Sequence, residues 1–208
     1  MDLSTLRAET RTRTGVPADD SLITDAVLTQ LVNAALQHIS TERDWPWLEK
    51  TTTVDTAGGT ATYAVPADWI RTVSVIGASG VPLRRTPIDE LDYMTGSGTP
   101  RFFGIFGDQT IVRPTPSGVE TLTHRYLATA PALAGDGDTP TMPAVYHYAI
   151  VAYAAYLLFR RSGNITEAGA SLAEYEGWLE RMRKQSDRWS DSQGGAMGAD
   201  AEPVKAKA

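Results

Sequence analysis

MPAVYHYAIVAYAAYLLFRR, residues 142–161, opens the most strongly periodic region of the chain, which continues to residue 188. The apolar side chains occupy most of the circumference of a helix, a pattern typical of a helix that is buried on several sides. Pro143 suits the first turn, and the two arginines that close the segment favour a helix C-terminus. Gly163 or Asn164 then provides a left-handed cap. The sequence therefore predicts a buried helix here.

A second helix follows this break, and its larger side chains recur at alternating steps of four and three residues. The residues at this spacing are Ala168, Leu172, Tyr175, Leu179, Met182, Ser186 and Trp189. Such spacing places them along one narrow seam of the helix. A seam of this kind needs a partner helix.

The N-terminal part of the chain supplies a partner. Residues 22–43 carry an apolar stripe along one side of a predicted helix. Asp44-Trp45-Pro46 ends that helix, because the residue before a proline avoids the helical conformation. Residues 2–13 predict a shorter helix with Leu3 and Leu6 as its only sizeable apolar side chains, and this helix would be marginal alone.

Between these helices lie short runs rich in Thr, Val, Ile and aromatic residues, which predict β-strands. The runs are 51–56, 60–65, 72–76, 102–106, 110–113 and 121–127. Gly58-Gly59 and Gly107-Asp108-Gln109 are signals for hairpin turns. Residues 87–94 predict a short helix, with Pro87 in its first turn.

The predicted fold is α+β: N-terminal and C-terminal helices form a bundle, and a small antiparallel β-sheet unit is inserted between them. The predicted segments are N-terminal helices at 1–50, the β-rich insertion at 51–141, the C-terminal helix pair at 142–190 and a flexible tail at 191–208. The predicted core includes Leu31, Ile39, Trp45, Trp69, Leu157, Leu172 and Leu179.

Composition narrows the class of protein. A hydrophobic content of 42% and a charged content of 21% are typical of a soluble globular protein. No apolar run approaches the roughly 18 residues that a membrane span requires, so no membrane partner is expected. The first fifteen residues lack the apolar stretch of a signal peptide. The formal net charge of −6 argues against a protein built to neutralise phosphates.

Motifs for catalysis and cofactor binding are not found. GxGxxG, GxxxxGK(S/T), HExxH and GxSxG do not occur in the sequence. The three histidines, His38, His124 and His147, do not have metal-ligand spacing. We therefore expect no enzymatic activity, no metal and no cofactor.

Four cations at the end of the last helix, together with two tryptophans, suggest a possible DNA-binding surface. They are Arg181, Arg183, Lys184 and Arg188, with Trp178 and Trp189 among them. The alternative is structural, because the glutamates come first and the cations last, which complements the helix dipole. Pairs such as Glu180 with Lys184 would also stabilise the helix itself. The sequence favours stabilisation of the helix over DNA binding.

The tyrosines of the 142–161 helix fall around three of its sides. Tyr146, Tyr148, Tyr153 and Tyr156, together with Trp178 of the next helix, are candidate subunit contacts, since aromatic side chains are enriched at protein interfaces. The alternative is that the β-rich insertion covers them within one chain.

The order of these parts resembles the head-to-tail adaptor, or connector, proteins of tailed bacteriophages. The resemblance covers about residues 20–190 and rests on three stretches in order. They are Asp44-Trp45-Pro46-Trp47-Leu48, then Tyr63-Ala64-Val65-Pro66-Ala67-Asp68-Trp69-Ile70, and then Met142 to Val151 before a tyrosine-containing last helix.

The resemblance implies a structural protein of the virion neck, assembled in the host cytoplasm. Proteins of this kind form a homo-oligomeric ring, usually dodecameric, beneath the phage portal protein. The ring extends the channel through which double-stranded DNA passes without sequence-specific binding, and it carries a stopper or tail protein below. The portal-docking candidates would be Lys184, Arg188 and Trp189 in the terminal region 184–208. The alternatives are a stopper or tail-completion protein of the same neck, and a small DNA-binding module.

Overall fold

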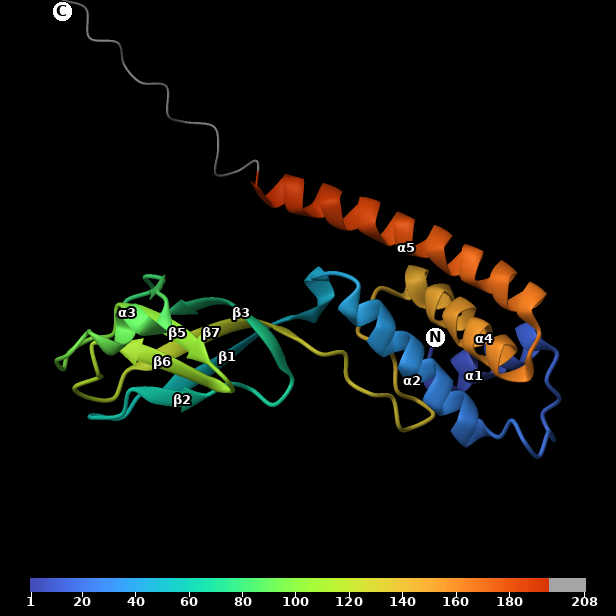
Figure 1. The fold of residues 1–208 in the computed structure, drawn as a ribbon, viewed down its shortest axis with the longest axis horizontal. Helices are drawn as coiled ribbons and strands as arrows, with labels where there is room; N and C mark the ends of the chain where they lie inside the picture. Colours follow the sequence, from blue (N-terminus) through green and yellow to red (C-terminus); the bar gives the residue numbers. More distant parts are fainter. Residues whose placement is uncertain (195–208) are drawn as a thin grey trace, which may run out of the picture. The chain divides into compact units, whose positions relative to one another are not determined.

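The computed structural model describes residues 1–194, with side chains as far as residue 187. The chain forms two compact units. Met1–Trp47 and the chain from Pro131 onward make a helical unit, and Leu48–Ala130 make a β-rich unit. Figure 1 shows helices and strands segregated in this way, which confirms the predicted α+β fold.

The helical unit is organised around α4 (His147–Ser162), which packs against three other helices. These are α1 (Leu3–Thr14), α2 (Asp25–Thr41) and α5 (Ile165–Gly194). Figure 1 shows α5 running alongside α4, as the contacts between them require. Two 3-10 turns, η1 (Pro46–Leu48) and η2 (Ala144–Tyr146), lie before β1 and α4. The central position of α4 explains why apolar residues occupy most of its circumference.

Local sequence sets the boundary between α4 and α5. Gly163 ends α4 with a φ of 77°, the left-handed conformation that glycine adopts without strain. The side chain of Asn164 accepts a hydrogen bond from the Glu167 N–H at 3.4 Å, within the first turn of α5. Gly163 therefore provides the left-handed cap of α4, and Asn164 caps the start of α5.

The short helix α1 contributes more to the core than its composition suggests. Leu3 and Leu6 are fully buried, and the hydroxyl of the equally buried Thr10 donates to the Leu6 carbonyl oxygen at 2.8 Å. Asp2 caps the helix by accepting a hydrogen bond from the Thr5 N–H at 2.8 Å, and this bond lowers the pKa of Asp2 to about 2. Packing against α2 and α4 thus stabilises a helix that is too short to be stable alone.

The β-rich unit contains two sheets, where the sequence predicted one antiparallel unit. β1 (Glu49–Asp55), β7 (Thr121–Ala128) and β3 (Trp69–Ile76) form an antiparallel sheet in that order. The second sheet has the order β2-β6-β5-β4. Its strands are β2 (Thr62–Ala64), β6 (Gln109–Arg113), β5 (Phe102–Phe106) and β4 (Arg84–Arg85), and the β4–β5 pair is parallel.

One of the two predicted hairpins is correct and the other is wrong. Gly107 takes a positive φ of 59° in the tight turn between β5 and β6, which pair directly. Gly58-Gly59 joins strands of different sheets, because β1 pairs with β7 and β2 pairs with β6. The Gly59 N–H donates to the Pro116 carbonyl oxygen at 2.9 Å, so the hydrogen-bond partner of this turn comes from a segment that is distant in the sequence.

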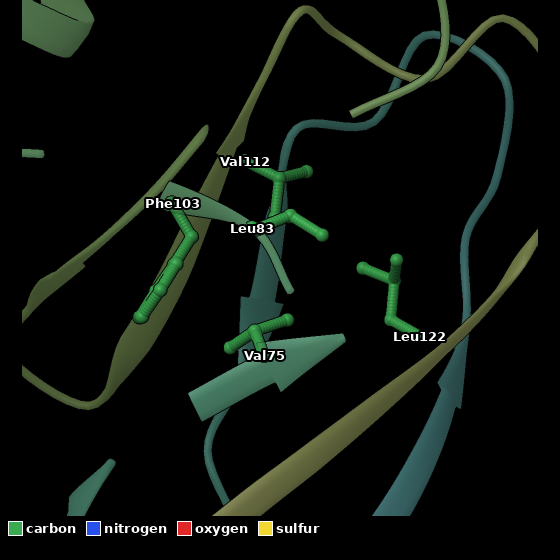
Figure 2. Close-up of a cluster of buried hydrophobic side chains, with 5 residues drawn as sticks. All are labelled: Val75, Leu83, Phe103, Val112 and Leu122. Atoms are coloured by element: carbon green, nitrogen blue, oxygen red, sulfur yellow. The ribbon is translucent and has the colours of Figure 1, made fainter. Parts of the chain in front are cut away.

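The two sheets share an apolar cluster, shown in Figure 2. Val75 and Leu122 come from the first sheet, Phe103 and Val112 from the second, and Leu83 directly precedes β4. The helix α3 (Ile88–Asp92) packs against β5 at Gly104. A Cβ atom at Gly104 would lie 2.6 Å from the Leu91 Cδ1 atom and 3.0 Å from the Thr86 carbonyl oxygen, so a larger residue here would force its neighbours to shift.

The predicted core residues differ in how deeply they lie. Ile39, Trp45 and Leu179 are buried. Leu31, Trp69, Leu157 and Leu172 are half-buried. In α4 it is Leu158, next to Leu157, that is buried. Trp45 is the largest fully buried side chain; its indole N–H donates to the Ile39 carbonyl oxygen at 2.6 Å and its rings stack on Trp47.

The last helix extends to Gly194, beyond residue 190 where the sequence ended the helix pair. Residues 195–208 of the predicted tail lie outside the described residues. Among residues 1–194, no helix combines the length and the apolar character needed to cross a bilayer.

Candidate interaction site

Two of the four tyrosines of the α4 region pack within the chain. Tyr146, in η2, is buried and lies 6.3 Å from Trp47 between ring centroids. Tyr153 is half-buried and stacks on His38, with ring centroids 4.3 Å apart and planes 12° apart. Its ring also contacts that of Tyr175, with centroids 4.7 Å apart, and Tyr175 lies 5.8 Å from His38. The partners of these two tyrosines come from η1, α2 and α5 of the same unit.

The hydroxyl group of Tyr175 is buried without a hydrogen-bond partner. Burial raises the pKa of Tyr175, and the nearby carboxylate of Glu42 raises it further, so the hydroxyl stays protonated. Glu42 accepts from Arg183 at 2.8 Å and lies 3.4 Å from His38. This arrangement holds α2 against α5 through charged groups at the rim of an aromatic cluster.

The exposed Tyr148 and the half-buried Trp178 form an aromatic pair between α4 and α5. Their ring planes are 18° apart and their centroids are separated by 6.4 Å. Tyr148 keeps 41% of its surface exposed. The Arg181 guanidinium lies 4.9 Å from the centre of the Trp178 ring, a cation–π contact that covers part of the indole. Tyr148, Trp178, Arg181 and the exposed Val145 are called the aromatic face below.

A groove of about 360 Å³ shares Val145 with the aromatic face. Trp47, Pro143 and Tyr146 also line it, together with Gln185 and Ser186 of α5. Val145 is 64% exposed at this groove. Analysis of the sequence did not find this groove, because its walls come from η1, η2 and α5, which are distant in the chain. Apolar surface at the groove and at the aromatic face together favours a contact with another protein.

The remaining interface candidate, Tyr156, is half-buried beside Tyr153, and its hydroxyl accepts a hydrogen bond from Arg160 at 3.1 Å. The structure therefore separates the candidates into two groups. Tyr146 and Tyr153 face other parts of the chain, whereas Tyr148 remains exposed and Trp178 lies half-buried beside it.

The cations of α5 are engaged within the unit as far as its side chains are described. Arg183 pairs with Glu42, and Lys184 pairs with Glu180 at 2.6 Å, as the spacing predicts. Arg181 stacks on Trp178. The side chains of Arg188 and Trp189 lie outside the described residues. This pairing agrees with a stabilising role within the helix and lowers the charge available for DNA.

The three histidines occupy separate places. His38 lies on α2, His124 on β7 and His147 at the start of α4. In the part of the chain that the structure describes, no three His, Asp or Glu side chains are grouped as metal ligands.

His147 and His124 are buried as neutral imidazoles. His147 Nε2 lies 3.1 Å from the Met142 carbonyl oxygen, which can only accept, so Nε2 donates and Nδ1 accepts from the Met1 amino group at 2.8 Å. His124 Nε2 contacts the Thr72 hydroxyl at 2.8 Å. Burial lowers the pKa of each imidazole.

We predict that the free energy of unfolding falls as the pH falls from 7.5 to 5.5. Because the pKa of His124 and of His147 is lower in the folded chain, the unfolded chain takes up protons first, near its own pKa of about 6.5. The loss is at most about 1.4 kcal/mol per pH unit for each histidine. Urea denaturation at three pH values measures it. The single variants His124→Gln and His147→Gln should each flatten this dependence, and an unchanged slope in both would refute the assignment.

Comparison with known proteins identifies the class to which this chain belongs. Residues 1–197 match the SU10 adaptor protein family. The chain belongs to this family, so it is a bacteriophage adaptor, and the resemblance to phage head-to-tail adaptors that the sequence indicated is confirmed. A search of curated proteins finds no match.

Proposed function

We propose that the chain assembles as a ring beneath the portal protein of the phage capsid. The ring extends the DNA channel and joins the capsid to a stopper or tail protein in the neck of the virion. The membership of the family over residues 1–197 supports this role. So does the surface of the helical unit, since an adaptor must contact neighbouring copies and at least two other proteins.

The observation that carries the proposal is the exposure of Tyr148, which stacks on the half-buried Trp178. α1, α2 and α5 cover most of the apolar surface of α4, and yet Tyr148 remains exposed, with part of the Trp178 surface accessible beside it. Large aromatic side chains with an arginine beside them are typical of the energetically dominant centre of a protein interface. The aromatic face is therefore the proposed lateral contact between copies in the ring.

Mass measurement tests ring assembly. Twelve copies of the 22.5-kDa chain would give a particle of about 270 kDa, alone or after addition of portal protein. The variant Tyr148→Asp should prevent assembly, because it places a charge in the centre of the contact. Its unfolding free energy in the monomer should stay within about 0.5 kcal/mol of the parent chain, as expected for a surface substitution.

Tyr93→Asp is a matched control, because Tyr93 is 88% exposed and belongs to the β-rich unit. This variant should assemble normally. If Tyr148→Asp still forms rings, the lateral contact lies elsewhere. If the parent chain remains monomeric with portal present, ring assembly itself is refuted.

Portal docking is proposed for the end of α5 and the residues that follow, with Lys184, Arg188 and Trp189 as candidates. Deleting residues 190–208 should leave the unfolding free energy unchanged and weaken co-sedimentation with portal. Unfolding of the truncated chain would show that these residues belong to the core. A full-length chain that enters the particle without binding portal would instead be a stopper one layer below.

A further inference from the structure

The β-rich unit carries four arginines that differ from Arg183 and Lys184 of α5, whose charges are neutralised by glutamates. Arg84 and Arg85 form β4, Arg101 directly precedes β5, and Arg113 ends β6. Within the residues that the structure describes, none of these guanidinium groups forms an ion pair with a carboxylate. We call the four residues the arginine corner.

Backbone hydrogen bonds bring the arginine corner together. The Arg84 N–H donates to the Arg101 carbonyl oxygen at 2.9 Å, and the Arg101 N–H donates to the Arg113 carbonyl oxygen at 2.8 Å. Three arginines thus occupy adjacent positions on neighbouring strands at one end of the sheet. Their spacing is fixed by the sheet, so ligand binding need not order the backbone.

The strand register places these side chains on both faces of the sheet. Arg84 and Arg113 both pair with Phe102, so they share one face. Arg85 and Arg101 alternate to the other face. Since β4 is an edge strand, the side chains of Arg84 and Arg85 can reach solvent around that edge, and Arg101 lies at the end of the sheet, just before the first residue of β5. Arg84, Arg85 and Arg101 are exposed and Arg113 is half-buried, with a bond from its guanidinium to the Val112 carbonyl oxygen at 3.2 Å.

A glycine- and serine-containing loop lies beside the corner. The Gly98 N–H donates to the Thr115 carbonyl oxygen at 2.8 Å, and the Thr115 N–H donates to the Gly96 carbonyl oxygen at 3.1 Å. These bonds attach the loop two residues after Arg113. Ser97, between the two glycines, is exposed. Hydroxyl groups next to guanidinium groups are common donors to phosphate oxygens.

We infer that the arginine corner contacts the phosphate backbone of duplex DNA, independently of base sequence. Guanidinium groups bind phosphate oxygens through paired hydrogen bonds, which ammonium groups cannot form in the same geometry. An acidic protein is the less suitable partner, because protein interfaces exclude charge from their centres whereas DNA interfaces are strongly positive. The inference does not depend on ring assembly, and it locates cationic contact outside α5.

The net charge of −6 limits the expected affinity for DNA, because the acidic groups elsewhere in the chain repel the DNA phosphates. Contact through three or four phosphates gives a salt dependence that corresponds to a loss of about 6- to 12-fold in affinity when the salt concentration doubles. Binding should be in the range of non-specific complexes, with a Kd on the order of 1–100 µM at physiological salt and tighter at 50 mM.

Fluorescence anisotropy with a labelled duplex of about 20 base pairs tests the inference at 50 and 100 mM NaCl, for two unrelated sequences. The full chain should bind both sequences equally. The variant Arg84→Gln/Arg85→Gln/Arg101→Gln should lose at least tenfold in affinity at 50 mM salt, and its salt dependence should fall to about twofold per doubling. The half-buried Arg113 is left in place so that folding is preserved.

The control variant Arg125→Gln/Arg160→Gln/Arg161→Gln removes the same charge from exposed arginines elsewhere and should bind like the parent chain. Equal losses of DNA affinity in both variants would show that only the net charge of the chain matters, and this would overturn the inference. So would absence of binding by the parent chain at 50 mM salt up to 100 µM protein, on the order of the upper limit for such complexes. Tighter binding of poly-glutamate than of DNA would assign the corner to an acidic protein instead.

Discussion

Replacing Trp45 with alanine should lower the free energy of unfolding by about 3–5 kcal/mol, the loss typical of removing a large aromatic side chain from a core. Trp45 is fully buried at the point where α2 ends, and its rings stack on Trp47 with centroids 4.7 Å apart. The substitution also leaves the Ile39 carbonyl oxygen without its indole donor. Urea denaturation followed by circular dichroism measures the change.

The variant Trp45→Phe separates the two contributions to this loss. It keeps an aromatic ring in the cavity but cannot donate to the Ile39 carbonyl oxygen. Its unfolding free energy should lie between those of the parent chain and the alanine variant. A loss below about 1 kcal/mol for alanine would show that the site collapses freely and that Trp45 is not a core residue.

Replacing Tyr153 with aspartate should cost about 2–5 kcal/mol, because it places a carboxylate in the aromatic cluster that Tyr153 forms with His38 and Tyr175. Burial already raises the pKa of Tyr153, which shows that this position disfavours a negative charge. Denaturation of the unassembled chain measures the effect.

Two comparisons make the test specific to burial. Tyr153→Phe keeps the stacked ring and should cost about 1 kcal/mol or less. Tyr148→Asp introduces the same charge on the same helix at an exposed position, and it should change the stability of the monomer little. Similar losses for the two aspartate variants would show that Tyr153 is not enclosed by α2 and α5.

Sequence periodicity located the elements closely, since their signals are local. The predicted strand 102–106 coincides with β5, because a two-residue turn ends it and its aromatic and β-branched residues favour a strand. Strand pairing was not predictable in the same way. β1 pairs with β7 and β2 with β6 across more than forty intervening residues, and the glycines at 58 and 59 give no indication of these partners.

The same limit applies to the interaction site. The four tyrosines look alike in the sequence, and which of them remains exposed depends on the helices that cover α4. α1 takes part in that cover through Leu3 and Leu6, although its sequence predicted a marginal helix. The arginine corner was missed because its members are scattered from residue 84 to residue 113, and only the β4–β5–β6 register brings them together.

The pairing of β1 with β7 has a consequence for how such a gene can change. Glu49 lies opposite Leu127, so the β-rich unit begins and ends on hydrogen-bonded neighbours, with Cα atoms about 5 Å apart. A segment with adjacent ends can be exchanged as a cassette without stretching the chain on either side. Recombination that replaces codons 48–130 would therefore give an adaptor with a new accessory domain on an inherited helical framework.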